Sequence, residues 1–188
     1  TDRTMVLHKM FRSTLTVSLM TLLSRITGLI RDIAFAQILG SGLVADAFFV
    51  AFRIPNFFRR IFAEGAFTAG FVPVYAEYES RYPAPQVRLF LDLMLGRLAL
   101  ILLLFTLLGV LGAPWLVAMI APGFVEQADK YAATVSALRF TFPYLFFVSL
   151  VAMAGGILNA RDRFAVPAIT PVLLNLCLIG AVIWAVPF

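Results

Sequence analysis

The sequence contains very few residues of the kinds that build disulfide frameworks or metal centres. Its 188 residues include one cysteine, Cys177, and one histidine, His8. A single cysteine excludes a disulfide framework within the chain, and so few Cys and His residues form no metal-ligand motif. Cys177 lies inside an apolar run, where we expect it to be a small buried hydrophobic side chain.

Motifs of phosphate enzymes are missing as well. A P-loop has the pattern G-x-x-x-x-G-K-[ST], and the only lysines, Lys9 and Lys130, lie in no such context, so the sequence indicates no ATP-powered mechanism. An enzyme acting on membrane-bound polyprenyl phosphates would need clustered carboxylates to bind a divalent metal. Neither DD nor D-x-x-D occurs. Such an enzyme stays an alternative interpretation, but the sequence favours a protein without enzymatic activity and without a cofactor.

Polar stretches are also rare, and the hydrophobic content is correspondingly high. Hydrophobic residues make up 62% of the chain and include 19 Phe, whereas soluble domains have about 45–50% apolar residues. The net charge of +5 comes without a basic run and without interleaved basic and aromatic residues, so we expect no nucleic acid partner. The composition predicts an all-α integral membrane protein.

Apolar segments long enough to cross a bilayer core of ~30 Å follow one another along the chain. We expect five transmembrane helices, joined by short segments that contain Gly, Pro and charged residues. Pro55 should kink or break the second helix, because proline removes a backbone hydrogen bond, and Pro143 should kink the fourth. The predicted helices comprise residues 14–39, 43–78 (broken near Pro55), 86–111, 129–158 and 165–184.

The basic residues outside the helices predict the orientation in the membrane. The short segments at 40–42 and 112–130 contain only one basic residue between them, Lys130. Cytoplasmic loops carry an excess of Lys and Arg, so the basic segments should be cytoplasmic, and with them the N-terminus. These segments contain Arg3, Lys9, Arg12, Arg81, Arg88, Arg161 and Arg163.

Two of the predicted spans carry charges at depths where a lipid-facing helix carries none. They contain Arg25, Arg31, Asp32, Asp46, Arg53, Arg59, Arg60 and Glu64. A charge at the bilayer centre is costly, so these side chains should face a water-filled cavity lined by protein. Five arginines against three carboxylates leave this cavity with a net charge of +2. Because guanidinium is always charged and suits bidentate contact with phosphate or carboxylate, the predicted ligand is an anion, preferably a phosphorylated one.

In the second predicted span, the charges form a stripe. Asp46, Arg53 and Arg60 are seven residues apart and Glu64 follows four residues later, which places all four within about 40° of one another on an ideal helix. Two structural alternatives remain open, a simple Arg60–Glu64 pair and an Arg53 side chain that extends to the membrane interface. Arg59 lies off this stripe and has no carboxylate on its own face, which favours contact with a ligand.

The first predicted span has two charged faces. Arg25 and Asp32 are seven residues apart and share a face, so a purely structural pair between them is an alternative to ligand binding. Arg31 points elsewhere on an ideal helix and has no carboxylate on its own face, which again favours a ligand. For the polar residues of the later spans we expect hydrogen bonds between helices, and these residues are Arg139, Asn159 and Asn175.

Several segments resemble a known family. LSRITGLIRD, DAFFVAFRIPNFFRRIFAEGAFTAGFVPVYAEY, APW, APGF, FPY and GGILNARDRFAVPA occur in this order. On these segments the chain is similar to the MurJ (MviN) family of lipid II flippases, in the superfamily that includes multidrug and polysaccharide-lipid exporters. The resemblance covers essentially all 188 residues, and RIPNFFRRIFAEGAF is highly specific.

The resemblance implies a fold of fourteen helices in two lobes, of which this chain would form most of the N-terminal lobe. It implies that lipid II is moved from the cytoplasmic to the outer face of the bacterial inner membrane by alternating access. Because the sequence indicates no ATP-powered mechanism, we expect membrane potential or an ion gradient to supply the energy. The implied partners are lipid II, membrane lipids and the remaining C-terminal part of the transporter. A cationic-drug exporter of the same superfamily is an alternative that conflicts with the arginine excess.

The resemblance also implies roles for the charged residues. Arg25, Arg31, Asp46 and Arg59 match family positions that are needed for function. The expected roles are therefore substrate binding by Arg25, Arg31, Arg53, Arg59 and Arg60, and gating or charge pairing by Asp32, Asp46 and Glu64.

Overall fold

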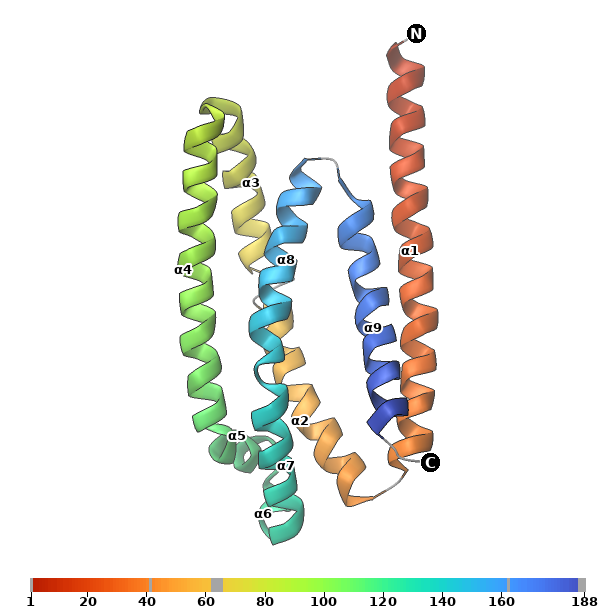
Figure 1. Cartoon of the computed structure of the whole chain (residues 1–188), viewed down its shortest axis with the longest axis vertical. Coiled ribbons are helices and arrows are strands. Elements are labelled where there is room, and N and C mark those ends of the chain that lie inside the picture. The colour runs from red at the N-terminus through yellow and green to blue at the C-terminus, as the bar shows by residue number, and fades with distance from the viewer. Residues whose placement is uncertain (1, 41, 62–65, 162, 186–188) are drawn as a thin grey trace. The chain divides into compact units, whose positions relative to one another are not determined.

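The computed structural model describes residues 2–40, 42–61, 66–161 and 163–185, with backbone only at 2–10, 12, 13, 39, 66–69 and 185. Glu64 lies outside the described residues. Within them the regular structure is entirely helical (Figure 1). The helices fall into two compact units, which we describe separately: unit 1 is Thr1–Gly40 with Arg161–Phe188, and unit 2 is Ser41–Ala160.

Unit 1 consists of two helices that run side by side, α1 (Asp2–Leu39) and α9 (Ala165–Ala185) (Figure 1). Helix α1 ends at Gly40, whose φ of 63° lies in the left-handed region that favours glycine. Phe35 and Val172 are buried. Cys177, which we expected to be buried, is exposed on α9, because within this unit only α1 covers α9.

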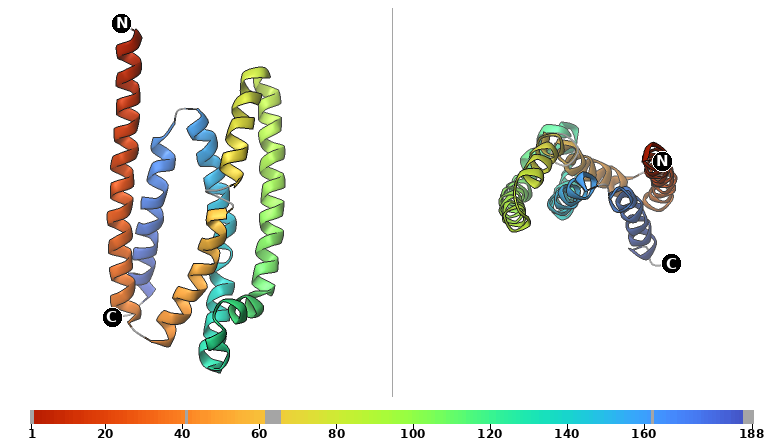
Figure 2. Two further views of the ribbon diagram at one scale, coloured as in Figure 1. Left: turned by 180° about the vertical axis from the view of Figure 1, so that it is seen from behind. Right: turned by 90° about the horizontal axis from the view of Figure 1, so that it is seen from above.

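Unit 2 contains the remaining helices. Helices α2 and α3 follow one another in the same direction, and α4 runs back beside them (Figure 2). Helix α2 packs against α7 and α8, whereas α3 and α4 pack against α8. The bounds are α2 (Leu43–Arg59), α3 (Ala66–Arg81), α4 (Ala84–Leu111), α5 (Ala113–Ile120), α6 (Pro122–Val125), α7 (Ala128–Thr141) and α8 (Tyr144–Ala160).

Two hydrophobic clusters hold unit 2 together. The first joins α2, α5, α7 and α8, and the second joins α3, α4 and α8, so that α8 contributes to both. The first contains Ala51, Ile54, Ala113, Val117, Val135, Leu138, Phe142 and Leu145. The second contains Phe71, Tyr75, Val87, Leu98, Leu102 and Met153.

Helix α2 continues through Pro55, where the sequence predicted a break. Proline has no N–H, so it leaves the carbonyl of Ala51, four residues earlier, without its usual helical partner. The hydroxyl of Thr141, at the end of α7, lies 3.2 Å from this carbonyl oxygen and 3.3 Å from that of Leu138 in its own helix, so the two carbonyls share its hydrogen. A neighbouring helix therefore satisfies the group that Pro55 frees, which is how proline is tolerated inside membrane helices. Helix α2 ends at Arg59, beyond Pro55.

Three stretches of the described residues are long and apolar enough to cross a membrane: Ala84–Leu111, Ala128–Ala160 and Ala165–Trp184. The second stretch comprises α7 and α8, which meet at Phe142 and Pro143. Large apolar side chains remain exposed on these helices, among them Leu108, Phe140 and Trp184. Exposed apolar surface of this extent suits contact with lipid, and the chain is an all-α, multi-pass membrane protein.

Candidate anion-binding residues

The charged residues singled out by the sequence are divided between the two units. Arg25, Arg31 and Asp32 lie on α1 in unit 1. In unit 2, Asp46, Arg53 and Arg59 lie on α2, and Arg60 is the residue that follows its end. Each unit is described by itself, and a cavity shared by all of these residues stays a prediction. Glu64 and its predicted pair with Arg60 lie outside the described residues.

Arg31 and Asp32 form an ion pair on α1. Nη2 of Arg31 lies 2.7 Å from Oδ1 of Asp32, and Nε donates to the same oxygen at 3.0 Å. The sequence assigned Arg31 no carboxylate, because adjacent residues point in different directions on a helix. That assignment was wrong: the arginine side chain is long enough to turn back to the neighbouring residue. The alternative Arg25–Asp32 pair is not formed.

A buried asparagine on α9 completes this centre. Nη1 of Arg31 donates to Oδ1 of Asn175 at 2.8 Å. Nδ2 of Asn175 donates in turn to the carbonyl oxygen of Ser24 at 3.1 Å and to Oγ1 of Thr27 at 3.2 Å. The predicted role of Asn175 in hydrogen bonding between helices is thus confirmed. Arg25 is exposed on the same helix and makes no ion pair with any residue in the described ranges.

At the start of α2, Asp46 is paired with a lysine. Nζ of Lys130, in the first turn of α7, lies 2.5 Å from Oδ2 of Asp46. The same ammonium group lies 4.3 Å from the ring centroid of Phe124, a cation–π distance. The sequence counted Lys130 only as a loop charge and missed this contact. Asp46 also lies in the first turn of α2, where the helix dipole favours a negative charge.

The arginines of α2 have different surroundings. Arg53 and Arg60 are exposed, on the side of the helix opposite the buried Ala51 and Ile54. Arg59 is half-buried, and its Nε donates to Oδ1 of Asn56 at 3.3 Å. Exposed guanidinium groups keep N–H donors available for a ligand, whereas the direction of Arg59 is partly set by its own helix.

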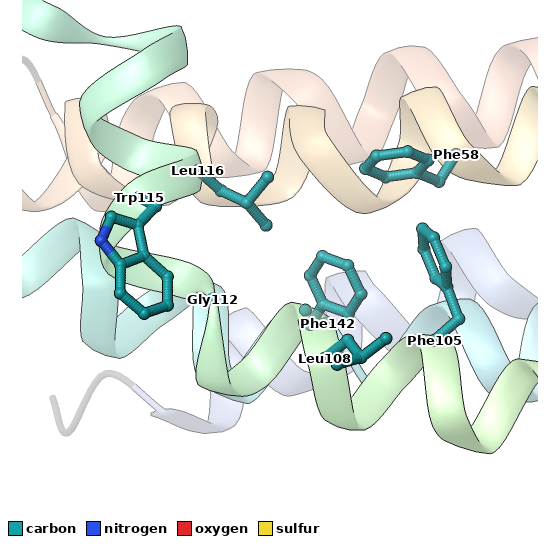
Figure 3. A pocket seen from close by; sticks show the side chains of 8 residues that line it. Phe58, Phe105, Leu108, Gly112, Trp115, Leu116 and Phe142 are labelled. Carbon is teal, nitrogen blue, oxygen red and sulfur yellow. The ribbon is translucent and has the colours of Figure 1, made fainter.

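A pocket of about 330 Å³ in unit 2 differs from the predicted charged cavity. It lies between α2, α4, α5 and the C-terminal end of α7, and Figure 3 shows aromatic and aliphatic side chains around it. None of the predicted substrate-binding residues lines it. Its surface suits a hydrocarbon group and offers nothing to hold an anion. The lining residues are Phe58, Phe105, Leu108, Gly109, Gly112, Trp115, Leu116 and Phe142.

Three contacts at these centres were not predicted from the sequence: Arg31 with Asp32, Lys130 with Asp46, and Asn175 with Arg31. An asparagine inside an apolar helix is a usable signal, since a polar amide at that depth needs partners, but its partner cannot be read from the sequence. In the part of the chain that the structure describes, no three His, Cys, Asp or Glu side chains are close enough to hold a metal ion.

The comparisons with known proteins agree with one another. The family model described as "Lipid II flippase MurJ" matches residues 35–187. The chain is 42% identical to the lipid II flippase MurJ of Burkholderia cenocepacia over 178 residues, which cover 95% of the chain and 34% of the relative. It is 41% identical to the probable lipid II flippase MurJ of Vibrio cholerae over 181 residues, which cover 93% of the chain and 34% of that relative.

The fold is also similar to a solved structure described as lipid II flippase MurJ in an inward closed conformation. The TM-score is 0.76 at 30% sequence identity, and the match covers 91% of this chain and 36% of that one. The chain therefore spans about one third of the length of the proteins it matches.

Proposed function

Because the chain belongs to the lipid II flippase MurJ family, a family of transporters, we propose that it supplies the N-terminal third of a lipid II flippase. The observation that carries the proposal is the similarity itself, 42% identity over 95% of the chain. The substrate would be lipid II, moved across the bacterial inner membrane without a covalent change. The N-terminus would be cytoplasmic, and the missing two thirds would come from a C-terminal part.

The arginines would bind the anionic headgroup in this proposal. Arg25, Arg53 and Arg60 are exposed, so their guanidinium groups can meet a ligand without first losing a buried partner. Arg31 is 23% exposed at its side chain and keeps part of its fork uncovered. Arg59 would contribute a fifth cation. Bidentate hydrogen bonds from such forks suit the diphosphate and the carboxylates of a lipid-linked precursor.

The carboxylates would act as exchangeable partners of these cations. Asp32 and Asp46 are 64% and 53% exposed at their side chains, so their ion pairs are open to competition. In the proposed cycle the headgroup displaces Asp32 from Arg31, and Asp46 and Glu64 change partners as the transporter alternates. Membrane potential or an ion gradient would drive the cycle, since one charge moved through 100 mV corresponds to about 2.3 kcal/mol.

Charge reversal tests this function. Arg31→Glu and Arg59→Glu are introduced separately into the protein encoded by its native gene. Each variant is then expressed in cells depleted of their resident lipid II flippase. We expect both variants to reach the membrane in normal amounts and to fail to restore growth and lipid II translocation. Arg139→Glu, an exposed arginine on α7 outside the proposed set, is the matched control. Normal growth with both variants would contradict the anion-binding role.

The alternative functions predict different ligands. An exporter of organic cations would bind a cation such as ethidium, and a polyprenyl-phosphate enzyme would release phosphate from a prenyl diphosphate. We expect the purified protein to bind a prenyl diphosphate in preference to ethidium and to leave it intact, as measured by equilibrium binding and phosphate release. Preference for ethidium, or release of phosphate, would replace the flippase assignment with the corresponding alternative.

A further inference from the structure

We propose that Asn175 of α9 is a positioning residue that fixes the guanidinium of Arg31 for contact with an anionic lipid headgroup. The proposal rests on the function proposed above for Arg31 and adds a residue that acts through it. Asn175 is only 6% exposed and lies on a different helix from Arg31, so it can act as a fixed reference point.

The orientation of the Asn175 amide follows from its neighbours. Nδ2 faces the carbonyl oxygen of Ser24 at 3.1 Å. A carbonyl oxygen only accepts hydrogen bonds, so the NH2 group must lie on this side of the amide. Oδ1 is therefore turned toward Arg31, from which it accepts the bond of 2.8 Å. The amide cannot rotate by 180° without losing both contacts.

Thr27 fixes the other end of the network. Its hydroxyl donates to the carbonyl of Leu23 at 2.9 Å and therefore presents a lone pair to Nδ2 of Asn175. Thr27 is 7% exposed. The donors thus all point one way, from Arg31 to Asn175 to Thr27 to the α1 backbone. Such a buried chain is rigid, because each bond polarises the next and a broken bond leaves an unsatisfied group in apolar surroundings.

Arg31 is held from two sides by this arrangement. Asp32 takes Nε and one N–H of Nη2, and Asn175 takes one N–H of Nη1. A guanidinium has five N–H donors, and the described partners use three of them. One N–H on each terminal nitrogen is not used by these partners. Asp32 is exposed and lies on the same helix as Arg31. With Asp32 as its only partner, the guanidinium would be free to move together with the Asp32 side chain. The bond to Asn175 prevents this movement.

Helix α1 passes near the amide at Gly28. A Cβ atom added at Gly28 would lie 3.4 Å from Nδ2 of Asn175. A purely structural role, in which Asn175 only joins α9 to α1, makes a different prediction, because its effect would not depend on Arg31.

A double-mutant cycle separates the two roles. Three variants are made in the protein encoded by its native gene: Asn175→Leu, Arg31→Gln and the double variant. For each, the Kd of farnesyl diphosphate and the melting temperature are measured in detergent. If Asn175 acts through Arg31, each single variant weakens binding by about tenfold, the size of effect of one charge-assisted hydrogen bond, and the double variant is no weaker than Arg31→Gln. Thr170→Val, which removes a hydroxyl bonded within α9, is the control and leaves Kd unchanged.

Each other outcome overturns a defined part of the proposal. Additive losses, of about a hundredfold in the double variant, would assign Asn175 a structural role only. A loss with Arg31→Gln but none with Asn175→Leu would remove the positioning role and leave the proposed function intact. No loss with Arg31→Gln would remove both. If Asn175→Leu does not fold, Asn175→Ser, which keeps a hydroxyl but cannot reach Arg31, takes its place in the cycle.

Discussion

At the scale of single residues, Lys130 is held from two sides. It pairs with Asp46 and lies over the ring of Phe124, and its side chain is 16% exposed. Asp46, in contrast, is 53% exposed, so solvent screens the pair. The contact therefore positions the first turns of α2 and α7 relative to each other more than it stabilises the fold. It also gives Asp46 a structural partner in addition to its proposed role in gating.

Removal of the lysine tests this interpretation. We expect Lys130→Gln to lower the free energy of unfolding by less than about 1 kcal/mol, because exposed ion pairs contribute little. Lys130→Arg should retain the stability, since guanidinium also pairs with carboxylate and stacks on aromatic rings. Denaturant unfolding in detergent measures both variants. A loss of several kcal/mol in Lys130→Gln would mean that the pair is buried and essential for folding.

Gly109 shows how a single missing side chain sets the packing in unit 2. A Cβ atom at this position of α4 would collide with the ring of Phe142, which is 1% exposed. We expect Gly109→Ala to destabilise the protein by about 1–3 kcal/mol, because the new methyl group would have to displace the buried Phe142 ring. Gly96→Ala is the matched control on the same helix, since a Cβ there meets nothing within 4 Å. Thermal unfolding compares the two, and equal melting temperatures would contradict the close contact.

At the scale of helices, the passage of α2 through Pro55 depends on α7. The hydroxyl of Thr141 takes the place of the N–H that proline lacks, at a carbonyl whose residue, Ala51, is fully buried. A helix that would otherwise have a weak point is thereby tied to its neighbour. This bond, together with the first hydrophobic cluster, explains why α2 remains regular up to Arg59.

The bond between Thr141 and Ala51 can be tested by its dependence on proline. We expect Thr141→Val to cost about 1–3 kcal/mol, because it leaves a buried carbonyl unsatisfied. In a Pro55→Ala background the alanine N–H can reach the Ala51 carbonyl, so the same substitution should cost less than about 0.5 kcal/mol. Urea unfolding of the four proteins gives both values. Equal costs in the two backgrounds would show that Thr141 does not replace the missing donor.

The apolar spans could be predicted from the sequence, because long apolar runs and their Gly and Pro boundaries have direct local causes. The start of α1 at Asp2, twelve residues before the predicted start, and the short helices α5 and α6 were not predicted. The spans predicted at 86–111 and 165–184 lie within one or two residues of α4 and α9. The partners could not be predicted. Pro55 looked like a break because its compensating hydroxyl lies far away in sequence, and Arg31 looked unpaired because ideal-helix geometry ignores the reach of a long side chain. Such tertiary contacts decide the details of the candidate site.

At the scale of the whole molecule, the chain matches only 34% of the length of its relative from Burkholderia cenocepacia. The arginines predicted to bind substrate place positive charge in both units, on α1 and on α2. The carboxylates predicted to pair with them are fewer than the arginines. Transport by alternating access requires two bodies that move against each other. The remaining part of the transporter is expected to supply the second body.

A chimera tests this division of labour. Residues 1–188 are joined to the remaining two thirds of the Burkholderia cenocepacia relative and are expressed in flippase-depleted cells. We expect the chimera, which would contain two lobes, to restore growth. The 188 residues alone, which would contain one lobe, should fail to restore it. The chimera with Arg31→Glu is the control for function within the grafted part. Growth supported by the 188 residues alone would show that they transport without a partner lobe.

The length of α1 has a consequence outside the bilayer. Its 38 residues correspond to about 57 Å at ~1.5 Å per residue, or about 54 Å along the membrane normal at a tilt of ~20°. A membrane with its headgroup layers is only about 40–45 Å thick. At that tilt a helix of this length exceeds the thickness of the membrane by roughly 10 Å, so α1 is too long to lie wholly within a bilayer that it crosses.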